Sequence, residues 1–215
     1  MSRLAWHFVG ETLRDGRPVP PDGEWLEHTG ELVMCDAGLH ASRRLLDALK
    51  YAPGVTLCRV RVDGRIIEES DDKLVASRRK IIWRIDAERV LRAFARWCAV
   101  QVLDQWAAPE VVVMFLLTGD ESLRAKARDA AWDAAGDTAG DAARAATRSA
   151  TRDAARAATR AAAWAAAGDA AWDAAWAVTW AAQDKQLRKM VREARAGKTQ
   201  WTFVAPASKE GTSND

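Results

Sequence analysis

The sequence lacks the features that mark several common protein classes. Its three cysteines, Cys35, Cys58 and Cys98, form no CxxC pair. This pattern argues against a disulfide framework or a zinc site and fits a reducing compartment. The N-terminal stretch MSRLAWHFVG has no apolar core of the kind found in signal peptides. The longest strongly apolar run, residues 111–117, is too short to span a bilayer. We therefore expect a cytoplasmic protein without a membrane partner.

Sequence motifs for common enzyme chemistries are also missing. The chain contains no GxGxxG, GxxxxGK[ST], GxSxG or HExxH motif. His7 and His28 have no companions at metal-ligand spacing, so we predict no metal site. The net charge is only +2, which creates no global field for nucleic acid or membrane. We accordingly predict no catalytic residue and no cofactor, and we consider a non-enzymatic role better supported than an enzyme.

Residues 1–86 have the pattern of a small mixed α/β domain. Apolar stretches with β-branched residues predict four strands, at residues 4–10, 31–35, 55–64 and 73–85. A short helix is predicted over residues 43–52, with Ser42 as its N-cap and Pro53-Gly54 as its end. Residues 14–30 are rich in Pro, Gly and Asp and are predicted to form loop and turns.

Connecting helices are predicted over residues 87–119. Asp86 is placed to cap a helix over residues 87–106, in which apolar residues recur at steps of three and four. Residues 109–117 are predicted to form a buried helix, with a strand as the alternative because β-branched residues are frequent there. Gly119 should end that helix, and Asp120 should cap the next one.

Residues 120–197 form an alanine-rich region with a repeat of four residues. Arg, Trp or Gly occupies every fourth position from Arg124 to Trp180, and Ala fills most places between them. Alanine at this density favours helix. A period of four drifts by about 40° per repeat on a helix, so breaks at Gly136, Gly140 and Gly168 are one solution. The sequence predicts an α+β protein whose all-α repeat region forms helical hairpins or a stalk, followed by a disordered tail at 198–215.

Two groups of bulky residues stand out within the repeats. The first is a basic column and the second an aromatic block: Arg144, Arg148, Arg152, Arg156 and Arg160, then Trp164, Trp172, Trp176 and Trp180. The aromatic block is best explained as packing anchors within the chain or between copies of it. A protein partner that uses exposed Trp residues is an alternative. Nucleic acid, held by Arg on phosphates and by Trp stacked on bases, is another.

A second candidate site lies in the segment CDAGLHASRR, residues 35–44. Gly38 allows a sharp turn after a strand, and His40 is expected to project from the resulting loop. Ser42, Arg43 and Arg44 are expected to open the helix, whose N-terminal amides favour an anion. A small anion or a nucleotide phosphate is therefore a candidate ligand, with His40 as acid, base or donor. In the alternative interpretation, His40 bonds to backbone and fixes the turn, while both arginines are solvated.

Several short segments resemble an uncharacterised small domain common in phage and prophage proteins. They are LVMCDAGLHAS, YAPG, LCRVRVDG and KLVASRRKII, which occur in that order over roughly residues 1–85. The domain that they resemble has a G-[FL]-H-A-C/S turn after a strand and is often followed by alanine-rich repeats. Ser42 stands where cysteine would be expected, which weakens a thiol-based activity. The resemblance implies a mobile-element context and supplies no reaction.

The function best supported by the sequence is a non-enzymatic interaction or assembly protein, with the helical repeats mediating self-association or binding of a protein partner. Two alternatives remain open. One is nucleic-acid binding through Arg144–Arg160 and the Trp block. The other is a small anion-binding, nucleotide-binding or transferase-like site at His40.

Overall fold

The computed structural model describes residues 2–67, 72–101, 103, 107–134 and 180–205 of the chain. Most of the predicted repeat region, and the tail from residue 206, lie outside the described residues. The chain divides into two compact units. The first comprises Met1–Arg92 and Trp180–Thr199, and the second comprises Ala93–Thr179 and Gln200–Asp215. The domain boundaries expected from the sequence stay a prediction.

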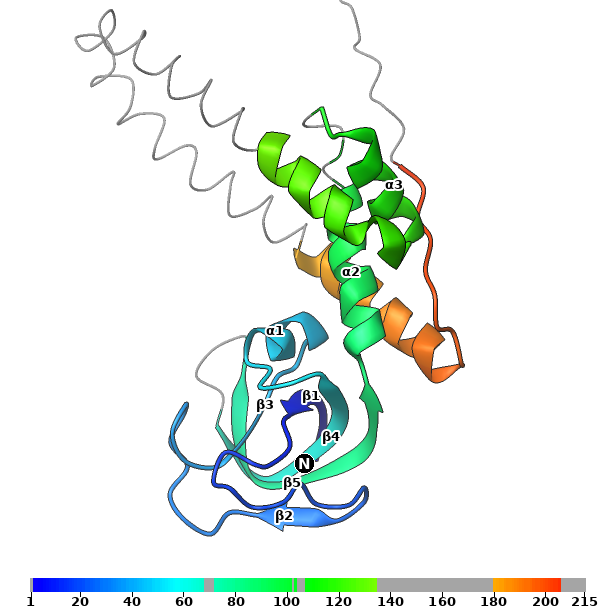
Figure 1. Ribbon diagram of the computed structural model, residues 1–215. Helices are drawn as coiled ribbons and strands as arrows, with labels where there is room; N and C mark the ends of the chain where they lie inside the picture. Colours follow the sequence, from blue (N-terminus) through cyan, green and yellow to red (C-terminus); the bar gives the residue numbers. More distant parts are fainter. Residues whose placement is uncertain (1, 68–71, 102, 104–106, 135–179, 206–215) are drawn as a thin grey trace, which may run out of the picture. The chain divides into compact units, whose positions relative to one another are not determined.

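The first unit is built on an antiparallel sheet. Its strands are β1 (Arg3–Val9), β2 (Trp25–Glu27), β3 (Leu39–Ala41), β4 (Thr56–Ile67) and β5 (Leu74–Asp86). They are ordered β1-β4-β5-β2, and β3 also pairs with β5 (Figure 1). Together with the short helix α1 (Leu45–Lys50), they confirm a mixed α/β fold for the N-terminal region.

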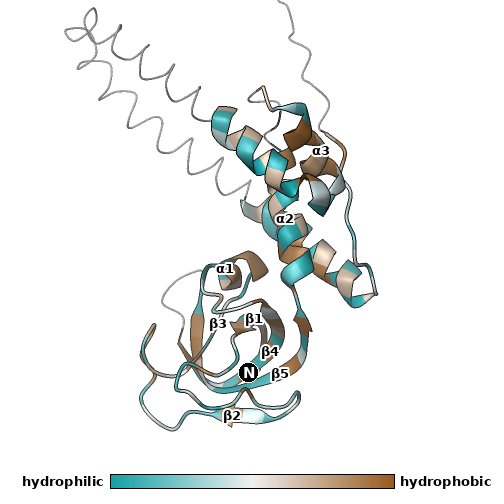
Figure 2. Cartoon of the chain, viewed as in Figure 1, coloured by the Kyte–Doolittle hydropathy of each residue, from teal (hydrophilic) through white to brown (hydrophobic). Residues whose placement is uncertain are grey.

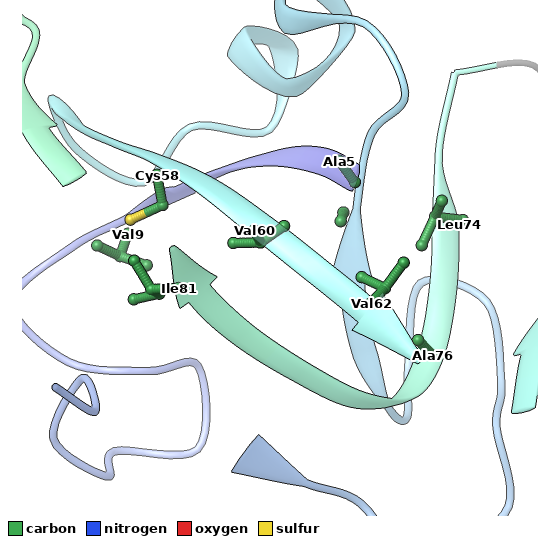
Figure 3. Close-up of a cluster of buried hydrophobic side chains, with 9 residues drawn as sticks. Ala5, Val9, Cys58, Val60, Val62, Leu74, Ala76 and Ile81 are labelled. Carbon is green, nitrogen blue, oxygen red and sulfur yellow. The ribbon is translucent and has the colours of Figure 1, made fainter. Parts of the chain in front are cut away.

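Alternation of apolar and polar residues explains the two long strands. Cys58, Val60 and Val62 are 0% exposed, as expected if every second residue of β4 faces the core. Ile81 of β5 lies directly across from Val60. Figure 3 shows this cluster, which Ala5 and Val9 of β1 join from the neighbouring strand. The predicted strands at 4–10, 55–64 and 73–85 are therefore confirmed.

The prediction of a strand at residues 31–35 is wrong. These residues form a turn closed by an isolated bridge between Val33 and Ala37. Cys35 has a φ of 67°, a left-handed conformation that ends any extended strand. The strand comes just afterwards, as β3, so His40 lies on a strand and not on a loop. The prediction of loop throughout residues 14–30 is also wrong, because β2 pairs with β5 inside that segment.

Helix α1 is shorter than predicted, and its cap differs from the expected one. Its N-cap is Arg44, whose side chain makes no capping hydrogen bond. Ser42 instead exchanges backbone hydrogen bonds with Trp6, at 2.8 and 2.9 Å, so the predicted Ser42 cap is wrong. The Leu46 amide donates to Asp184 Oδ1 at 2.9 Å. The first turn of α1 is thus capped by a carboxylate from 138 residues further along the chain.

Asp184 belongs to a helical segment, residues 180–195, that is part of the first unit. Leu187, Met190 and Val191 of this segment are at most 1% exposed. Trp180, the last aromatic residue of the repeat series, donates from Nε1 to Asp47 Oδ1 at 3.1 Å. The ammonium of Lys50 lies 4.6 Å from the centroid of the Trp180 ring. At this one position, the structure uses a repeat tryptophan for packing within the chain.

Helices follow β5 in the described part of the chain. They are α2 (Glu88–Val100), α3 (Glu110–Thr118), the 3-10 turn η2 (Glu121–Leu123) and a helical segment at residues 124–134. Asp86 accepts from the Glu88 amide and Asp120 from the Ser122 amide, both at 2.9 Å. Gly119 ends α3 with a φ of 70°. The predicted caps at Asp86 and Asp120 and the predicted helix end at Gly119 are therefore confirmed.

Two details of these helices differ from expectation. Helix α2 ends at Val100, whereas the sequence predicted a helix to residue 106. Helix α3 is strongly apolar (Figure 2), yet Val112 is the one residue in it that is fully buried. The prediction of a helix there is confirmed, and the prediction that the helix is buried is wrong. Across the described part of the chain, no helix is both long enough and apolar enough to cross a membrane.

Candidate functional site

A pocket of about 690 Å³ opens in the first unit. Its walls come from β1, β3, the loop at residues 10–17 and the turn that begins at Cys35. The polar groups most relevant to its chemistry come from separate parts of the chain. They are His7, Cys35, His40, Lys73 and Arg79. The volume lies within the range of about 300–1,000 Å³ that is typical of small-molecule sites.

Arg79 is the buried cation of this pocket. Its side chain lies on the core face of β5, because Arg79 pairs across the sheet with the fully buried Val62. Arg79 is 7% exposed, and Nη1 donates to the backbone oxygen of His40 at 2.5 Å. Among the described residues, no carboxylate forms an ion pair with Arg79. Burial lowers the pKa of the guanidinium to about 10. A buried charge without a counter-ion is costly, and such groups concentrate at functional sites.

His7 adds a neutral imidazole to the same region. It projects from β1 between the core residues Ala5 and Val9. Burial lowers the pKa of His7 well below its usual value, and electrostatic repulsion from the nearby Arg79 and His40 lowers it further. The ring is therefore uncharged at neutral pH and offers one donor and one acceptor.

His40 is engaged by the backbone of its own turn. The Cys35 amide donates to Nε2 of His40 at 3.0 Å. Burial is the main cause of the lowered pKa of His40, followed by the charges of Arg79 and Arg14, while a hydrogen bond with the Gly38 backbone acts in the opposite direction. These contacts match the interpretation in which His40 fixes the turn, and they leave its ring little freedom to move protons.

Of the other residues of the predicted anion site, Ser42 shares the pocket with His40, and Arg43 and Arg44 do not. Ser42 is 3% exposed and lines the pocket. Arg43 and Arg44 are exposed and do not line the pocket. Arg44 Nε lies 3.9 Å from Asp47 Oδ2. The amide expected to hold an anion is already bonded to a carboxylate of the chain itself, as described above.

A cationic cluster lies elsewhere in the pocket wall, around Cys35. Lys73 Nζ lies 2.7 Å from Cys35 Sγ and 4.5 Å from the centroid of the Tyr51 ring. Arg14 Nη1 donates to the backbone oxygen of Cys35 at 2.7 Å. The hydrogen bond with Cys35 is the main cause of the raised pKa of Lys73. The pocket therefore offers positive charge at Arg79 and again at Lys73 and Arg14.

Sequence reasoning missed Arg79, His7, Lys73 and Tyr51. A signal existed for the first two, since each occupies a core-facing position of a strand where an apolar residue is the rule. Arg79 lies two residues from Ile81, and His7 two residues from Ala5. Lys73 and Tyr51 carry no such local signal, because only the pairing of distant segments brings them to Cys35.

The basic column Arg144–Arg160 and the residues Trp164, Trp172 and Trp176 lie outside the described residues. Trp180 is half-buried in the first unit. Within the described part of the chain, no group of three or more His, Cys, Asp or Glu side chains is arranged to hold a metal ion.

Comparisons with known proteins bear on the first unit alone. The comparison with curated proteins and the comparison with solved structures each returned no match. A family model does match, and it covers the sheet, α1 and the start of α2. Over residues 4–93 the chain is similar to the family described as "Domain of unknown function (DUF7666)", which confirms the expectation of a small uncharacterised domain at the N-terminus.

Proposed function

We propose that the first unit binds a small anionic ligand in the pocket, with Arg79 as the main charge partner of that ligand. The observation that carries this proposal is the burial of the Arg79 guanidinium in a pocket wall without a carboxylate partner among the described residues. Proteins rarely keep a buried charge uncompensated. An anionic ligand would supply the missing charge.

The chemistry of the pocket favours phosphate or carboxylate as the anionic group. A guanidinium presents planar, paired donors that match these oxyanions. The neutral ring of His7 can add one N–H donor. Lys73 and Arg14 provide a second cationic region in the same cavity. The volume of about 690 Å³ exceeds what a bare phosphate needs, so we favour an organic phosphate of about mononucleotide size.

Binding is better supported than group transfer at this site. A transferase-like role for His40 would need its ring as acid or base. The ring already accepts from the Cys35 amide and bonds with the Gly38 backbone. We therefore assign His40 to holding the wall that contains Cys35, and we assign ligand recognition to Arg79.

A binding assay tests this proposal directly. We would titrate the full chain with inorganic phosphate and with adenosine monophosphate by isothermal titration calorimetry. We expect saturable binding that is lost in Arg79→Met and kept in Arg89→Met, a matched change at an exposed position of α2. Equal binding by both variants would place the anion elsewhere, and no binding of either probe by the wild type would count against an anion pocket.

An interaction role for the repeats is a second candidate, and one described residue favours it. Trp132, a member of the four-residue series, is 80% exposed on the helical segment 124–134. An exposed tryptophan of this kind is a frequent anchor in protein interfaces. We propose that the repeats mediate self-association or bind a protein partner. The mobile-element context rests on the resemblance alone.

Light scattering after size exclusion would test the second candidate. We expect the full chain to have a mass above that of one copy, and Trp132→Ser to lower it. Val204→Ser, at another exposed apolar position of the second unit, is the control. A single-copy mass for the wild type at high concentration would contradict self-association, and a retained mass in Trp132→Ser would exclude Trp132 as an anchor.

A further inference from the structure

The sheet face opposite the buried cluster of Cys58, Val60 and Val62, here called the outer face, carries cations and an aromatic residue in register, while its other end, at Trp6, Phe8 and Leu57, is buried. Leu4 of β1 pairs with Arg61 of β4, Arg61 pairs with Lys80 of β5, and Lys80 pairs with Trp25 of β2. Residues directly across a sheet project from the same face. These four side chains therefore form one row across four strands, which we call the outer row.

Alternation along the strands separates this row from the pocket. The neighbouring residues Val62 and Arg79 are buried on the core side. Arg61 is exposed, and Lys80 and Trp25 are half-exposed. A ligand on the outer row would therefore contact none of the groups assigned to anion recognition.

The two cations in the middle of the outer row, Arg61 and Lys80, have no carboxylate partner among the described residues. Two acids lie one row further: Glu27 is paired with Arg78 at 3.0 Å, and Asp63 lies across the sheet from Arg78. Arg65, also exposed, donates to the backbone oxygen of Gly30, and no carboxylate of the described residues forms an ion pair with it. The face therefore carries net positive charge and suits a polyanion.

Trp25 gives the same face an aromatic surface beside the cations. The Lys80 ammonium lies 4.8 Å from the centroid of its ring, and the Arg78 guanidinium lies 4.6 Å away. These contacts hold the indole at the end of the outer row. A half-exposed indole next to cations provides a plane on which a flat ring can stack.

We infer that the outer row binds single-stranded nucleic acid, with Arg61 and Lys80 on phosphates and Trp25 stacked on a base. Proteins that bind single strands combine a cationic track for the backbone with aromatic platforms for bases. A duplex keeps its base planes stacked on each other, so it can use only the cations of this face. An acidic protein segment would use the cations but would gain nothing from an aromatic plane.

Fluorescence anisotropy of the full chain with a labelled oligo-dT and with an oligo-U of the same length tests this inference. We expect binding that weakens with salt. Arg61→Gln with Lys80→Gln should reduce the slope of log K against log salt by about 1.4, because each phosphate contact contributes about 0.7 for single strands. The matched control is Arg89→Gln with Lys185→Gln, which removes the same charges from exposed helical positions of the first unit.

The aromatic contribution is tested at Trp25. Trp25→Leu should weaken binding by about tenfold, while Trp25→Phe should retain most of it, because a stacked base contributes roughly 1–3 kcal/mol. Ultraviolet crosslinking of an oligo-U with 4-thiouridine needs no variant, and the crosslinked peptide should contain Trp25 or Lys80.

Several outcomes would overturn the inference. They are no binding of either oligonucleotide at low salt, full retention of binding in the Arg61/Lys80 variant, and crosslinks confined to the repeat region, which would favour the column Arg144–Arg160 instead. The inference would also be rejected if duplex DNA bound as tightly as single strands and Trp25→Leu had no effect, because the face would then be a general polyanion surface.

Discussion

Replacing Arg79 by methionine should stabilise the protein while removing its proposed ligand site. Burial lowers the pKa of Arg79 from the usual value of a guanidinium to about 10. At 1.36 kcal/mol per pH unit, this difference corresponds to about 3 kcal/mol against the charged form in the folded state. Methionine removes that cost, and its flexible side chain can fill the same space.

One favourable contact is lost in the exchange. The hydrogen bond from the charged Arg79 guanidinium to the His40 oxygen contributes about 2 kcal/mol in net terms. The expected gain in the free energy of unfolding is therefore about 1 kcal/mol. With an m-value of about 2 kcal/mol per M, the urea midpoint should rise by about 0.5 M. Exchange of buried charges for apolar residues has this direction in other proteins.

Urea denaturation without added anions, followed by tryptophan fluorescence, measures the change. Arg61→Met is the control, because the exposed guanidinium of Arg61 should change stability by less than about 0.5 kcal/mol. A loss of 1 kcal/mol or more in Arg79→Met would refute the reasoning, since it would mean that the folded protein stabilises the charge. A rise in the wild-type midpoint on adding phosphate, absent from Arg79→Met, would link the burial cost to ligand binding.

Three further measurements follow from the structure. Asp184→Ala should cost about 1–3 kcal/mol in urea denaturation, because the Leu46 amide loses its carboxylate acceptor, and a neutral effect would show that the cap is dispensable. Because the pKa of His7 is lowered, unfolded His7 takes up a proton below about pH 6.5 while folded His7 does not; stability should therefore fall between pH 7.5 and 5, and His7→Gln should flatten this trend. Iodoacetamide at pH 8 should label the exposed Cys35 and spare Cys58, whose burial raises its pKa to about 11; mass spectrometry of the labelled peptides would show the reverse if the assignment fails.

The long strands and the helix caps at Asp86 and Asp120 could be predicted from the sequence because their signals are local. Alternation across Cys58, Val60 and Val62 identifies the buried face of β4 without knowledge of its partners. Asp86 and Asp120 cap helices that begin within a few residues of them. In contrast, β2 and β3 are three residues long and lie among turn-forming residues, where too few positions alternate to be recognised.

The candidate site was only partly accessible for the same reason. His40 and Ser42 were named from one short motif, and both line the pocket. Arg79 breaks the apolar alternation of β5 and could have been recognised as a polar residue at a core position. The contact of Lys73 with Cys35 joins residues 38 positions apart, and the cap of α1 comes from 138 positions away. Neither follows from local pattern, since only the fold brings such residues together.

The helical segment 180–195 belongs to the first unit although it lies far along the chain, so this unit is discontinuous in sequence. Its two parts are separated in sequence by residues 93–179, which hold most of the four-residue repeats. The entropy of closing a connection grows only slowly, by about 0.6 kcal/mol for each doubling of a flexible loop. Gain or loss of a few repeats should therefore leave the sheet and its pocket intact. If a protease cut the chain among the repeats, the helical segment 180–195 would be held to the sheet by noncovalent contacts alone. The first unit would then behave as a complex of two polypeptides.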